Sequence, residues 1–313
     1  MESDRRTPQN TPIRVAVFVE ENGGDWHTSR LVEALESLGA SVVIATLSQC
    51  AFDSASKTGL DIPGFADALP DGVFVRSVSK GSLEQITLRL GILHALSASG
   101  VRVWNPARVI ERCVDKSTAT FLFQRANLPT PQTRTAEGQT AAIAYAQKKM
   151  PLVSKPLFGS QGRGVTRITK TPDLPAPEEL GNVYYLQRYI PPAPDQGFAD
   201  WRVLVSANHA IASMKRLGRD WVTNVFQGSS PEPWQDTEMA KLAIRAAKAV
   251  GADYAGVDLI RNGDGQLLVL EINSNPAWKG LQSVTDQNIA ACLAVDFLTA
   301  VQRHIKITQH QPT

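Results

Sequence analysis

The chain has 313 residues, of which 43% are hydrophobic and 20% are charged, and its formal net charge is +2. These values are ordinary for a globular protein and give no support for a nucleic-acid or membrane partner. There is no run of 18 apolar residues, and the first ten residues, MESDRRTPQN, lack the apolar segment of a signal peptide. Cys50, Cys113 and Cys292 lie too far apart for a metal spacing or a disulfide framework, so we expect a cytoplasmic protein.

The first part of the chain predicts strands that alternate with helices. We expect strands at residues 13–19, 41–47, 72–76 and 101–104, with helices at about 29–38 and 83–97. A loop and a helix between successive strands indicate a parallel, doubly wound α/β domain. We assign it to residues 13–112, after a disordered N-terminus of residues 1–12.

The rest of the chain predicts two further subdomains. Asp115 has the position of an N-cap for a helix that ends near Asn127, and a small α/β segment follows. We therefore place a central subdomain at residues 113–185 and a C-terminal subdomain at 186–306, with a tail at 307–313. The latter holds predicted strands at 201–206 and 210–216, a helix at about 236–250 and a hairpin at 254–275.

The hairpin, YAGVDLIRNGDGQLLVLEINSN, carries the most informative residues. Asp264-Gly265 predicts a two-residue type I′ turn, in which Gly263 faces Gln266 and Asp258 therefore lies opposite Glu271. Alternation puts Asn273 on the face of Glu271 and leaves an apolar set on the other face, namely Ala255, Val257, Leu259, Leu270 and Ile272. Opposed carboxylates destabilise a ladder unless a cation lies between them, and such oxygen ligands suit Mg²⁺ or Mn²⁺. On its own, the hairpin is equally consistent with a solvated acidic face.

A glycine-rich segment follows another predicted strand. Lys155 ends the strand, and Gly159, Gly162 and Gly164 follow within nine residues. Glycines let backbone N–H groups approach a phosphate, and the lysine adds a charge for the same anion. The order of a Walker A loop is absent, and residues 165–169 indicate a strand instead of a helix. Taken alone, this segment is more simply interpreted as a glycine-rich hairpin turn.

Further charged residues could bind an anion. Lys116 lies in the first turn of a helix, where the helix dipole disfavours a cation, although a solvated surface lysine is the simpler interpretation. Asp200 and Arg202 share a face of one predicted strand, and Lys215 and Arg216 lie on the next. They fit either triphosphate ligands or a surface ladder of salt bridges.

Taken in order, these motifs resemble the ATP-grasp superfamily, and within it the RimK-type carboxylate–amine ligases. The resemblance runs from about Ile13 to Leu298 and is carried by DK at 115, SKPLFGSQGRGV at 154, LQRYI at 186, DWRV at 200, MKR at 214, WVTN at 221, AGVDL at 255 and LEINSNP at 270. It implies a three-domain α/β fold that holds ATP between the central and C-terminal subdomains, together with two Mg²⁺ or Mn²⁺ ions.

The resemblance also implies which residues serve each part of the reaction. Nucleotide binding falls to Lys116, Lys155, Gly159, Ser160, Gln161, Gly162, Gly164, Asp200 and Arg202, with an adenine hinge at Gln187, Arg188, Tyr189 and Ile190. Phosphate or acyl-intermediate binding falls to Lys215, Arg216 and Asn224. The divalent ions fall to Asp258, Glu271 and Asn273.

The implied activity is formation of an amide bond through an acyl phosphate. Glutamate is the family's usual amine, the acceptor is a small-molecule or protein carboxylate, and the NSNPAWKGLQ segment suggests a setting in one-carbon coenzyme biosynthesis. Val222 stands where the pattern (F/W)R(S/T)N has arginine, NSNPAWKG replaces NxxPGxxG, and Arg188 stands where an acidic residue is common. If the amine is glutamate, Arg216 and then Arg219 are the candidates to bind its carboxylates.

Other functions fit less well. A nucleotide-binding partner protein that has lost catalysis agrees with the altered loops but not with the retained Lys155, Asp258, Glu271 and Asn273. An NAD-dependent Rossmann enzyme is excluded because ENGGDWH, instead of GxGxxG, follows the first strand. A ligase making D-Ala-D-Ala-type dipeptides fits the TN and NSNP segments poorly. The expected partners are small-molecule substrates, without nucleic acid or membrane, and the resemblance allows a homo-oligomer.

Overall fold

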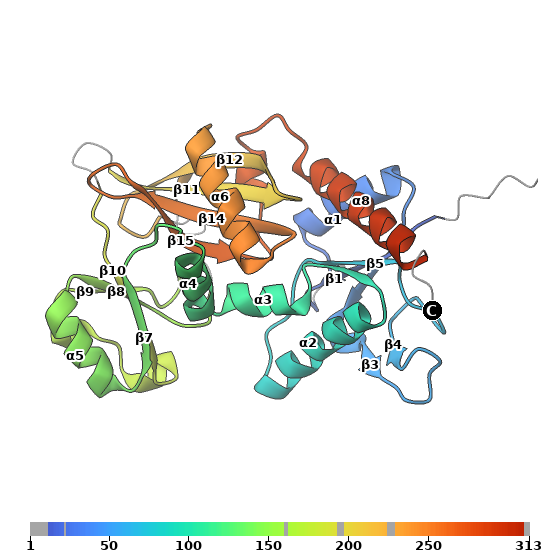
Figure 1. Ribbon diagram of the computed structural model, residues 1–313, viewed down its shortest axis with the longest axis horizontal. Helices are drawn as coiled ribbons and strands as arrows, with labels where there is room; N and C mark the ends of the chain where they lie inside the picture. Colours follow the sequence, from blue (N-terminus) through green and yellow to red (C-terminus); the bar gives the residue numbers. More distant parts are fainter. Residues whose placement is uncertain (1–11, 22, 160–161, 193–196, 224–228, 310–313) are drawn as a thin grey trace, which may run out of the picture. The chain divides into compact units, whose positions relative to one another are not determined.

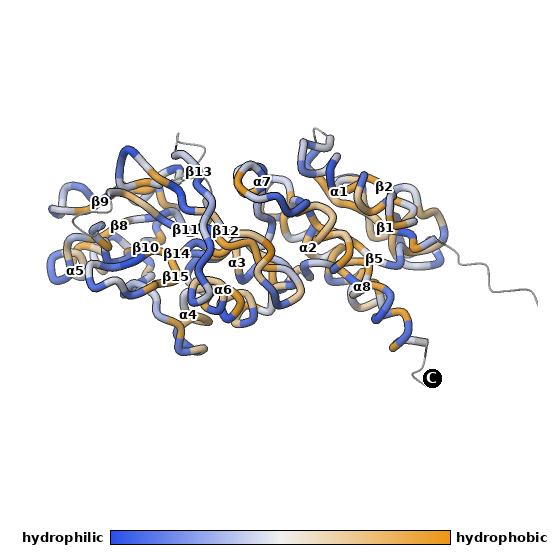
Figure 2. Tube along the Cα trace, turned by 90° about the horizontal axis from the view of Figure 1, so that it is seen from above, coloured by the Kyte–Doolittle hydropathy of each residue, from blue (hydrophilic) through white to orange (hydrophobic). Residues whose placement is uncertain are grey.

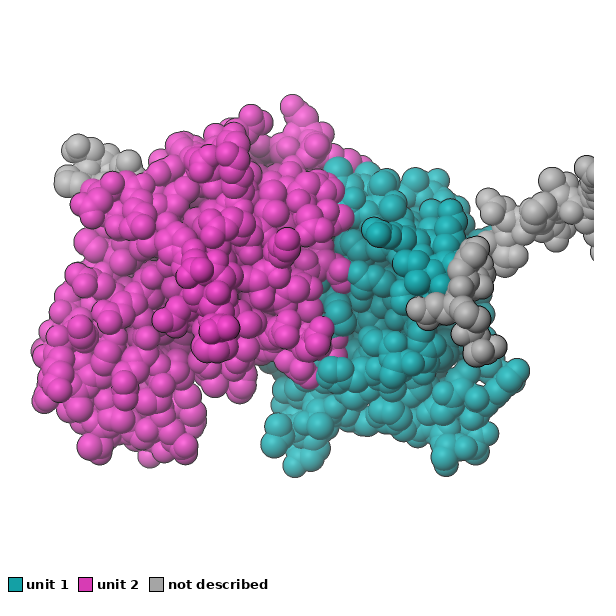
Figure 3. All heavy atoms as spheres, viewed as in Figure 1, with its two compact units in different colours: residues 1–106, 290–313 teal, residues 107–289 magenta. Residues whose placement is uncertain are grey.

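The computed structural model describes residues 12–21, 23–159, 162–192, 197–223 and 229–309 (Figure 1). The chain forms two compact units, residues 1–106 with 290–313 and residues 107–289, coloured teal and magenta in Figure 3. Within the described ranges, no helix is both long and apolar enough to cross a membrane. The predicted division into three domains stays a prediction.

Unit 1 is built on a parallel sheet of order β2-β1-β5-β6, as expected for a doubly wound α/β domain. Its strands are β1 (Arg14–Val19), β2 (Ser41–Thr46), β5 (Gly72–Val75) and β6 (Arg102–Trp104), with a small β3 (Ala51–Phe52) and β4 (Leu60–Asp61) pair. Its helices are α1 (Trp26–Ser37), α2 (Leu83–Ala98) and α8 (Ile289–Gln309), with a 3₁₀ turn η1 at Leu47–Gln49. Side-chain caps from Asp25 and Ser82 begin α1 and α2.

Helix α8 packs on this sheet, although the sequence placed residues 290–306 in the C-terminal subdomain. Phe297 meets the rings of Phe74 and Trp104 edge-on, with centroids 5.4 and 5.9 Å apart. The strand residue Gly72 lies beneath the same helix, and a Cβ built there would collide with Val301 and lie 3.0 Å from Phe297. The apolar face of α8 therefore needs the flat surface that this glycine leaves on β5.

We expect Gly72→Ala to lower the free energy of unfolding by about 1–3 kcal/mol, because the added methyl group overpacks the contact with Val301. Chemical denaturation followed by circular dichroism would measure the change. Gly263→Ala is the matched control, because a Cβ at Gly263 meets nothing within 4 Å. Equal midpoints for the two variants would contradict the tight packing of α8 on β5.

Unit 2 contains two antiparallel sheets. One has the order β7-β10-β8-β9 and the other β13-β12-β11-β14-β15. The strands are β7 (Thr133–Glu137), β8 (Leu152–Lys155), β9 (Thr166–Ile168), β10 (Val183–Arg188), β11 (Phe198–Ser206), β12 (His209–Gly218), β13 (Ser230–Pro233), β14 (Tyr254–Arg261) and β15 (Leu267–Asn273). The helices are α3 (Ala107–Val114), α4 (Lys116–Arg125), α5 (Gln139–Lys149), α6 (Thr237–Val250) and α7 (Lys279–Gln282), with 3₁₀ turns η2 (Thr171–Asp173) and η3 (Pro177–Leu180).

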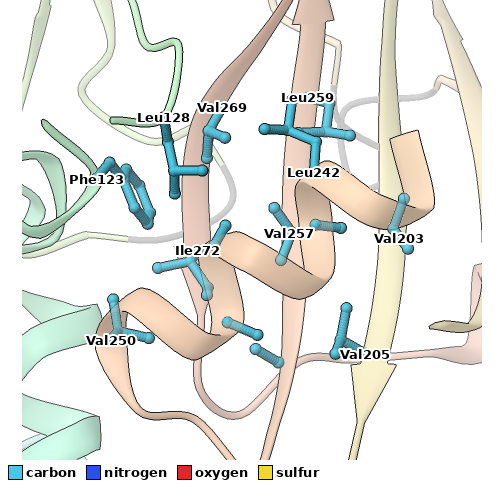
Figure 4. Packing of buried hydrophobic residues seen from close by; sticks show 14 of the residues in the cluster. Phe123, Leu128, Val203, Val205, Leu242, Val250, Val257, Leu259, Val269 and Ile272 are labelled. Carbon is cyan, nitrogen blue, oxygen red and sulfur yellow. The ribbon is translucent and has the colours of Figure 1, made fainter. Parts of the chain in front are cut away.

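The main core of unit 2 lies between α6 and the larger sheet (Figure 4). Leu242 and Val250 of α6 face Val203, Val257 and Ile272 of the strands. Buried apolar residues recur every three or four positions along α6, which therefore shows both orange and blue segments in Figure 2, as expected of a helix with one buried face. The opposite face of the sheet is thereby left for polar side chains, and the candidate site is built there.

The hairpin of β14 and β15 differs from the predicted one in its turn. The loop has three residues, Gly263 to Gly265, with Asn262 facing Gln266 and with Gly265 at φ +80°. The side-chain oxygen of Asn262 accepts the N–H groups of Asp264 (3.1 Å) and Gln266 (2.8 Å), which stabilises this longer loop. The predicted two-residue type I′ turn was therefore wrong.

A β-bulge restores the predicted register, which the three-residue loop alone would have shifted by one residue. Leu259 pairs with Val269 but Asp258 pairs with Glu271, so Leu270 is the extra residue. The predicted opposition of Asp258 and Glu271 is confirmed because the two offsets cancel. The bulge also moves Leu270 off the apolar face, where we had placed it, and Val269 joins the core instead.

Candidate active site

A cavity of about 130 Å³ in unit 2 brings together most of the side chains singled out above. One water needs only about 10–15 Å³, so this cavity has room for part of a larger ligand. Its charged lining residues are five cations, Lys116, Lys155, Arg163, Arg188 and Arg216, and three anions, Asp200, Asp258 and Glu271. The excess of cations favours an anionic ligand.

Lys155 is, together with Arg216, one of two deeply buried cations of the site. Only 7% of its surface is exposed, and its Nζ donates to Oε1 of Gln187 at 2.8 Å. Nε2 of Gln187 donates in turn to the hydroxyl of Tyr185 at 3.1 Å, which lies 2.9 Å from that of Thr120 on α4. Burial lowers the pKa of Lys155, and the charge of Glu271 opposes this shift most strongly. An anion beside Nζ would stabilise the charged form.

Lys116 lies at the start of α4 because Asp115 caps that helix through the N–H groups of Ser117 and Thr118. Its Nζ donates to the carbonyl oxygens of Leu157 (3.3 Å) and Gly159 (3.0 Å). Burial lowers the pKa of Lys116 too, with Glu271 as the main opposing charge. Lys116 thus supports the beginning of the glycine-rich segment and faces the same carboxylate as Lys155.

The glycine-rich segment joins β8 to β9, as predicted from the strand at residues 165–169. Gly162 and Gly164 have φ values of +71° and +70°, which favour glycine, and a Cβ at Gly164 would lie 2.8 Å from Pro156. Ser160 and Gln161 lie outside the described residues. Gly159 and Gly162 line the cavity, whereas Gly164 does not, so the segment borders the site from one side.

Four charged side chains form a buried cluster on β11, β12 and β14. Arg202 binds Asp258 through two hydrogen bonds of 2.7 Å, and Arg216 lies 3.1 Å from the same carboxylate. Arg216 also binds Asp200 through bonds of 2.5 and 2.6 Å. Burial would raise the pKa of Asp258, but Arg202 and Arg216 hold it well below its usual range. The carboxylate of Asp258 is therefore charged and already shared by two cations.

The three oxygen donors predicted for a metal lie on the facing strands β14 and β15. Asp258 lies opposite Glu271, and Asn273 lies opposite Gly256, where a Cβ would approach Pro276 to 2.9 Å. The side-chain oxygen of Asn273 accepts the N–H of Asn275 at 3.0 Å. Among the described residues, no three acidic, histidine or cysteine side chains form a metal cluster. The donor set is thus two carboxylates and one amide.

Residues 113–296 match the family model of the RimK-like ATP-grasp domain. The chain belongs to this family. The predicted resemblance and the ATP-grasp fold class are therefore confirmed. The match covers unit 2 almost completely and includes every motif that led to the prediction.

Two glutamate ligases are similar to this chain over most of its length. A tetrahydromethanopterin:alpha-L-glutamate ligase of Methanococcus maripaludis is 30% identical over 93% of this chain and 100% of its own length. The corresponding ligase of Methanocaldococcus jannaschii is 37% identical over 72% of this chain and 78% of its own. The predicted enzyme class, an ATP-dependent ligase that forms C–N bonds, is confirmed by these relatives.

Solved structures share the fold of this RimK-like protein at low sequence identity. The ATP-grasp ligase PsnB, complexed with its minimal precursor, superposes with a TM-score of 0.71 at 19% identity, over 92% of this chain and 99% of that one. The D-cycloserine synthetase DcsG has a TM-score of 0.68 at 18% identity, over 93% and 99% of the two chains. At this identity the likeness concerns the fold.

The RimK-like site includes twelve of the residues chosen from the sequence. The cavity is lined by Lys116, Lys155, Gly159, Gly162, Gln187, Arg188, Tyr189, Ile190, Asp200, Arg216, Asp258 and Glu271. Arg202 and Asn273 lie beside lining residues without lining the cavity themselves. Asn224 falls outside the described residues.

Lys215 is not brought to the cavity. Alternation along β12 sends Arg216 toward Asp200 and Lys215 to the other face, where its Nζ lies 5.7 Å from the ring centre of Trp234. The sequence motif could not separate the two neighbours, because both are cationic. The register of β11 against β12, in which Asp200 faces Arg216, decides which one serves the site.

Some lining residues were missed. Val153, Pro156, Arg163, Val165, Trp221, Val222, Thr223, Ile260 and Leu270 also line the cavity. Most are apolar and carry no chemical signal in a single sequence, although period-2 spacing from Asp258 could have found Ile260. Val222, noted as a departure from the family pattern, lies in the wall of the site, so the departure changes the site itself.

Proposed function

We propose that this ligase joins L-glutamate, through an amide bond, to a carboxylate of a pterin-type one-carbon coenzyme. The observation that carries the proposal is the likeness to the ligase of Methanococcus maripaludis, which spans that protein's whole length and acts on tetrahydromethanopterin and glutamate by name. The buried Lys155 and the half-buried Lys116, both of which feel the charge of Glu271, would neutralise the phosphate charge that such a reaction moves.

The reaction would proceed in two steps, through an acyl-phosphate intermediate. A carboxylate oxygen of the acceptor attacks the γ-phosphorus of ATP, and the bond to the β-bridging oxygen breaks, so ADP leaves and an acyl phosphate forms. The glutamate nitrogen then attacks the acyl carbon, inorganic phosphate leaves with the C–O electron pair, and the nitrogen loses a proton. Lys155 and Lys116, which line the cavity, would neutralise phosphate charge, and the segment at Gly162 would limit access of water to the acyl phosphate.

The adenine base would bind at the hinge that follows β10. The N–H groups of Arg188 and Tyr189 already donate to the carbonyls of Gln132 (2.8 Å) and Pro151 (3.1 Å). The edge of the base would therefore meet the carbonyl of Arg188 and the N–H of Ile190. Oε1 of Gln187 is held toward the cavity by Lys155 and could accept a hydrogen bond from an exocyclic amine.

Magnesium would be held by Glu271, Asn273 and Asp258. Carboxylate and amide oxygens are the ligands that Mg²⁺ and Mn²⁺ prefer, so the donor set fits, with Asp258 shared by two arginines. When bound, divalent ions neutralise charge that develops on the transferring phosphoryl group. We propose two ions, the number the family resemblance implies.

Arg216 does not suit the role of a glutamate ligand. Its guanidinium is buried and holds the two carboxylates Asp200 and Asp258, so it contributes little free positive charge. The exposed Arg219, our second candidate, keeps that proposed role. The other function, a nucleotide-binding partner without catalysis, is not favoured, because the matching relatives are ligases and Lys155, Asp258 and Glu271 lie together in one cavity.

The test is a substrate panel with the purified protein. We expect sustained turnover of ATP to ADP with Mg²⁺ only when L-glutamate and a reduced pterin carboxylate, such as tetrahydromethanopterin, are both present; the acceptor without an amine should give at most about one ADP per protein molecule. Mass spectrometry should show the acceptor heavier by one glutamyl residue. L-Glutamine and L-aspartate serve as matched amines. Turnover with another amine, and none with glutamate, would contradict the proposed substrate while leaving the ligase class intact.

A further inference from the structure

We propose that Arg202 competes with a divalent cation for Asp258. The ion reaches that carboxylate only after the guanidinium has left at least one of its oxygens. The inference rests on the proposed function, because it takes Asp258 as a ligand of the catalytic metal. The resemblance of the sequence motif had assigned Arg202 to nucleotide binding instead.

The geometry of the pair leaves little room for a third partner. Arg202 lies directly opposite Asp258 across β11 and β14, and it takes one carboxylate oxygen with Nε and the other with a terminal nitrogen, both at 2.7 Å. Arg216 takes the second oxygen as well, at 3.1 Å. Mg²⁺ requires an oxygen at about 2.0–2.1 Å, so an ion on Asp258 would have to share the carboxylate with guanidinium groups that are also positively charged.

Arg202 is the arginine that can move. Its side chain is 14% exposed, and within the described residues both of its ion-pair bonds go to Asp258. The side chain of Arg216 is 3% exposed and is fixed by Asp200 as well. Releasing Arg202 therefore breaks one ion pair, whereas releasing Arg216 would leave two buried aspartates without their shared partner.

The charges around Asp258 determine how strongly a divalent ion is attracted to the site. Asp200, Asp258, Arg202 and Arg216 together are neutral, and Glu271 faces the two lysines 116 and 155. These charges therefore attract a divalent ion only weakly when no nucleotide is bound. The negative charge of a nucleotide phosphate would add to the attraction, so the ion should bind much more tightly with nucleotide than without it.

The direct test is a titration with Mn²⁺, followed by electron paramagnetic resonance, in the absence of nucleotide. Arg202→Gln should bind Mn²⁺ about tenfold or more tightly than wild type, because Asp258 loses its strongest competing partner. Arg202→Lys, which keeps the charge but not the two-pronged contact, should give a smaller gain. Arg261→Gln is the matched control. Arg261 lies on the same strand as Asp258 but pairs with Asp236, so its replacement should leave Mn²⁺ affinity unchanged.

A double-mutant cycle shows whether Arg202 acts through Asp258. In the Asp258→Asn background, Arg202→Gln should no longer change Mn²⁺ affinity. Circular dichroism shows whether each variant is folded, and Arg202→Lys provides the test if Arg202→Gln is not. Equal or weaker Mn²⁺ binding by folded Arg202 variants would overturn the proposal, as would an undiminished gain in the Asp258→Asn background.

The proposed function can fail separately. If the wild type glutamylates its acceptor with Mn²⁺ while Arg202 variants show no gain in Mn²⁺ affinity, the competition is wrong and the ligase function stands. If Mn²⁺ affinity rises as expected but no glutamyl product forms with any pterin carboxylate, the competition stands and the substrate assignment is wrong.

Discussion

Replacing Lys155 with methionine should weaken ADP binding about 10- to 100-fold, since a hydrogen bond from a charged donor is worth about 1.5–3 kcal/mol. Methionine keeps most of the buried volume of the side chain, so the surrounding packing should persist. Gln187 would lose the donor to its Oε1, which should also slow turnover. Isothermal titration calorimetry with ADP and Mg²⁺, alongside an assay of ADP release, would measure both effects.

Lys215→Met is the matched variant for comparison with Lys155→Met. The sequence motif gave Lys215 a role in phosphate or acyl-intermediate binding, but its Nζ lies over Trp234 and away from the cavity. We expect this variant to keep its ADP affinity and most of its turnover. Similar losses in both variants would refute the structural placement of Lys215, and unchanged ADP affinity in Lys155→Met would remove Lys155 from the nucleotide site.

Glu271→Gln should lower turnover about a hundredfold or more at saturating Mg²⁺, because the metal's stabilisation of the transferring phosphate is worth several kcal/mol. Glutamine keeps the shape of the side chain and removes its charge. Glu238→Gln is the matched control, because Glu238 is exposed and pairs only with Lys241 one helical turn away among the described residues. Wild-type turnover in Glu271→Gln would exclude Glu271 as a metal ligand.

The same variant has an expected result for stability. Two facing carboxylates suggest from the sequence that removing one would stabilise the protein. In the structure each has cations nearby: Asp258 has Arg202 and Arg216, and burial lowers the pKa values of Lys116 and Lys155 while the charge of Glu271 opposes that shift. We therefore expect the melting temperature of Glu271→Gln, measured without metal, to be unchanged or lower. A rise of several degrees would show that repulsion between the carboxylates dominates.

Local signals in the sequence were sufficient for most elements and for several side-chain roles. Asp115 and Asp236 cap α4 and α6 as expected of such residues before apolar-periodic segments. Gly162 and Gly164 adopt a left-handed backbone, which glycine favours. These features depend on residues close together in the chain, so a single sequence contains the information.

The hairpin shows how a correct contact can follow from an incorrect turn. Asp258 faces Glu271 because a three-residue loop and a bulge at Leu270 shift the register in opposite directions. Turn statistics favour Asp-Gly as a two-residue loop, but the side chain of Asn262 binds two backbone N–H groups and stabilises the longer one. The bulge leaves no signature in the order of apolar residues.

The sequence alone determined the family, the ATP-grasp fold, the acidic hairpin and the lysines of the site, because these reside in short motifs whose order along the chain is itself informative. Only the tertiary structure decided which neighbouring cation faces the cavity, that Arg216 joins Asp200 to Asp258, and that Arg202 binds the carboxylate of Asp258, which we propose as a metal ligand. Those partners are separated by up to 56 residues, and their pairing depends on the register of β11 with β12 and β14. Register is fixed by the packing of whole sheets against α6, and a change of one residue would turn each of these side chains to the opposite face.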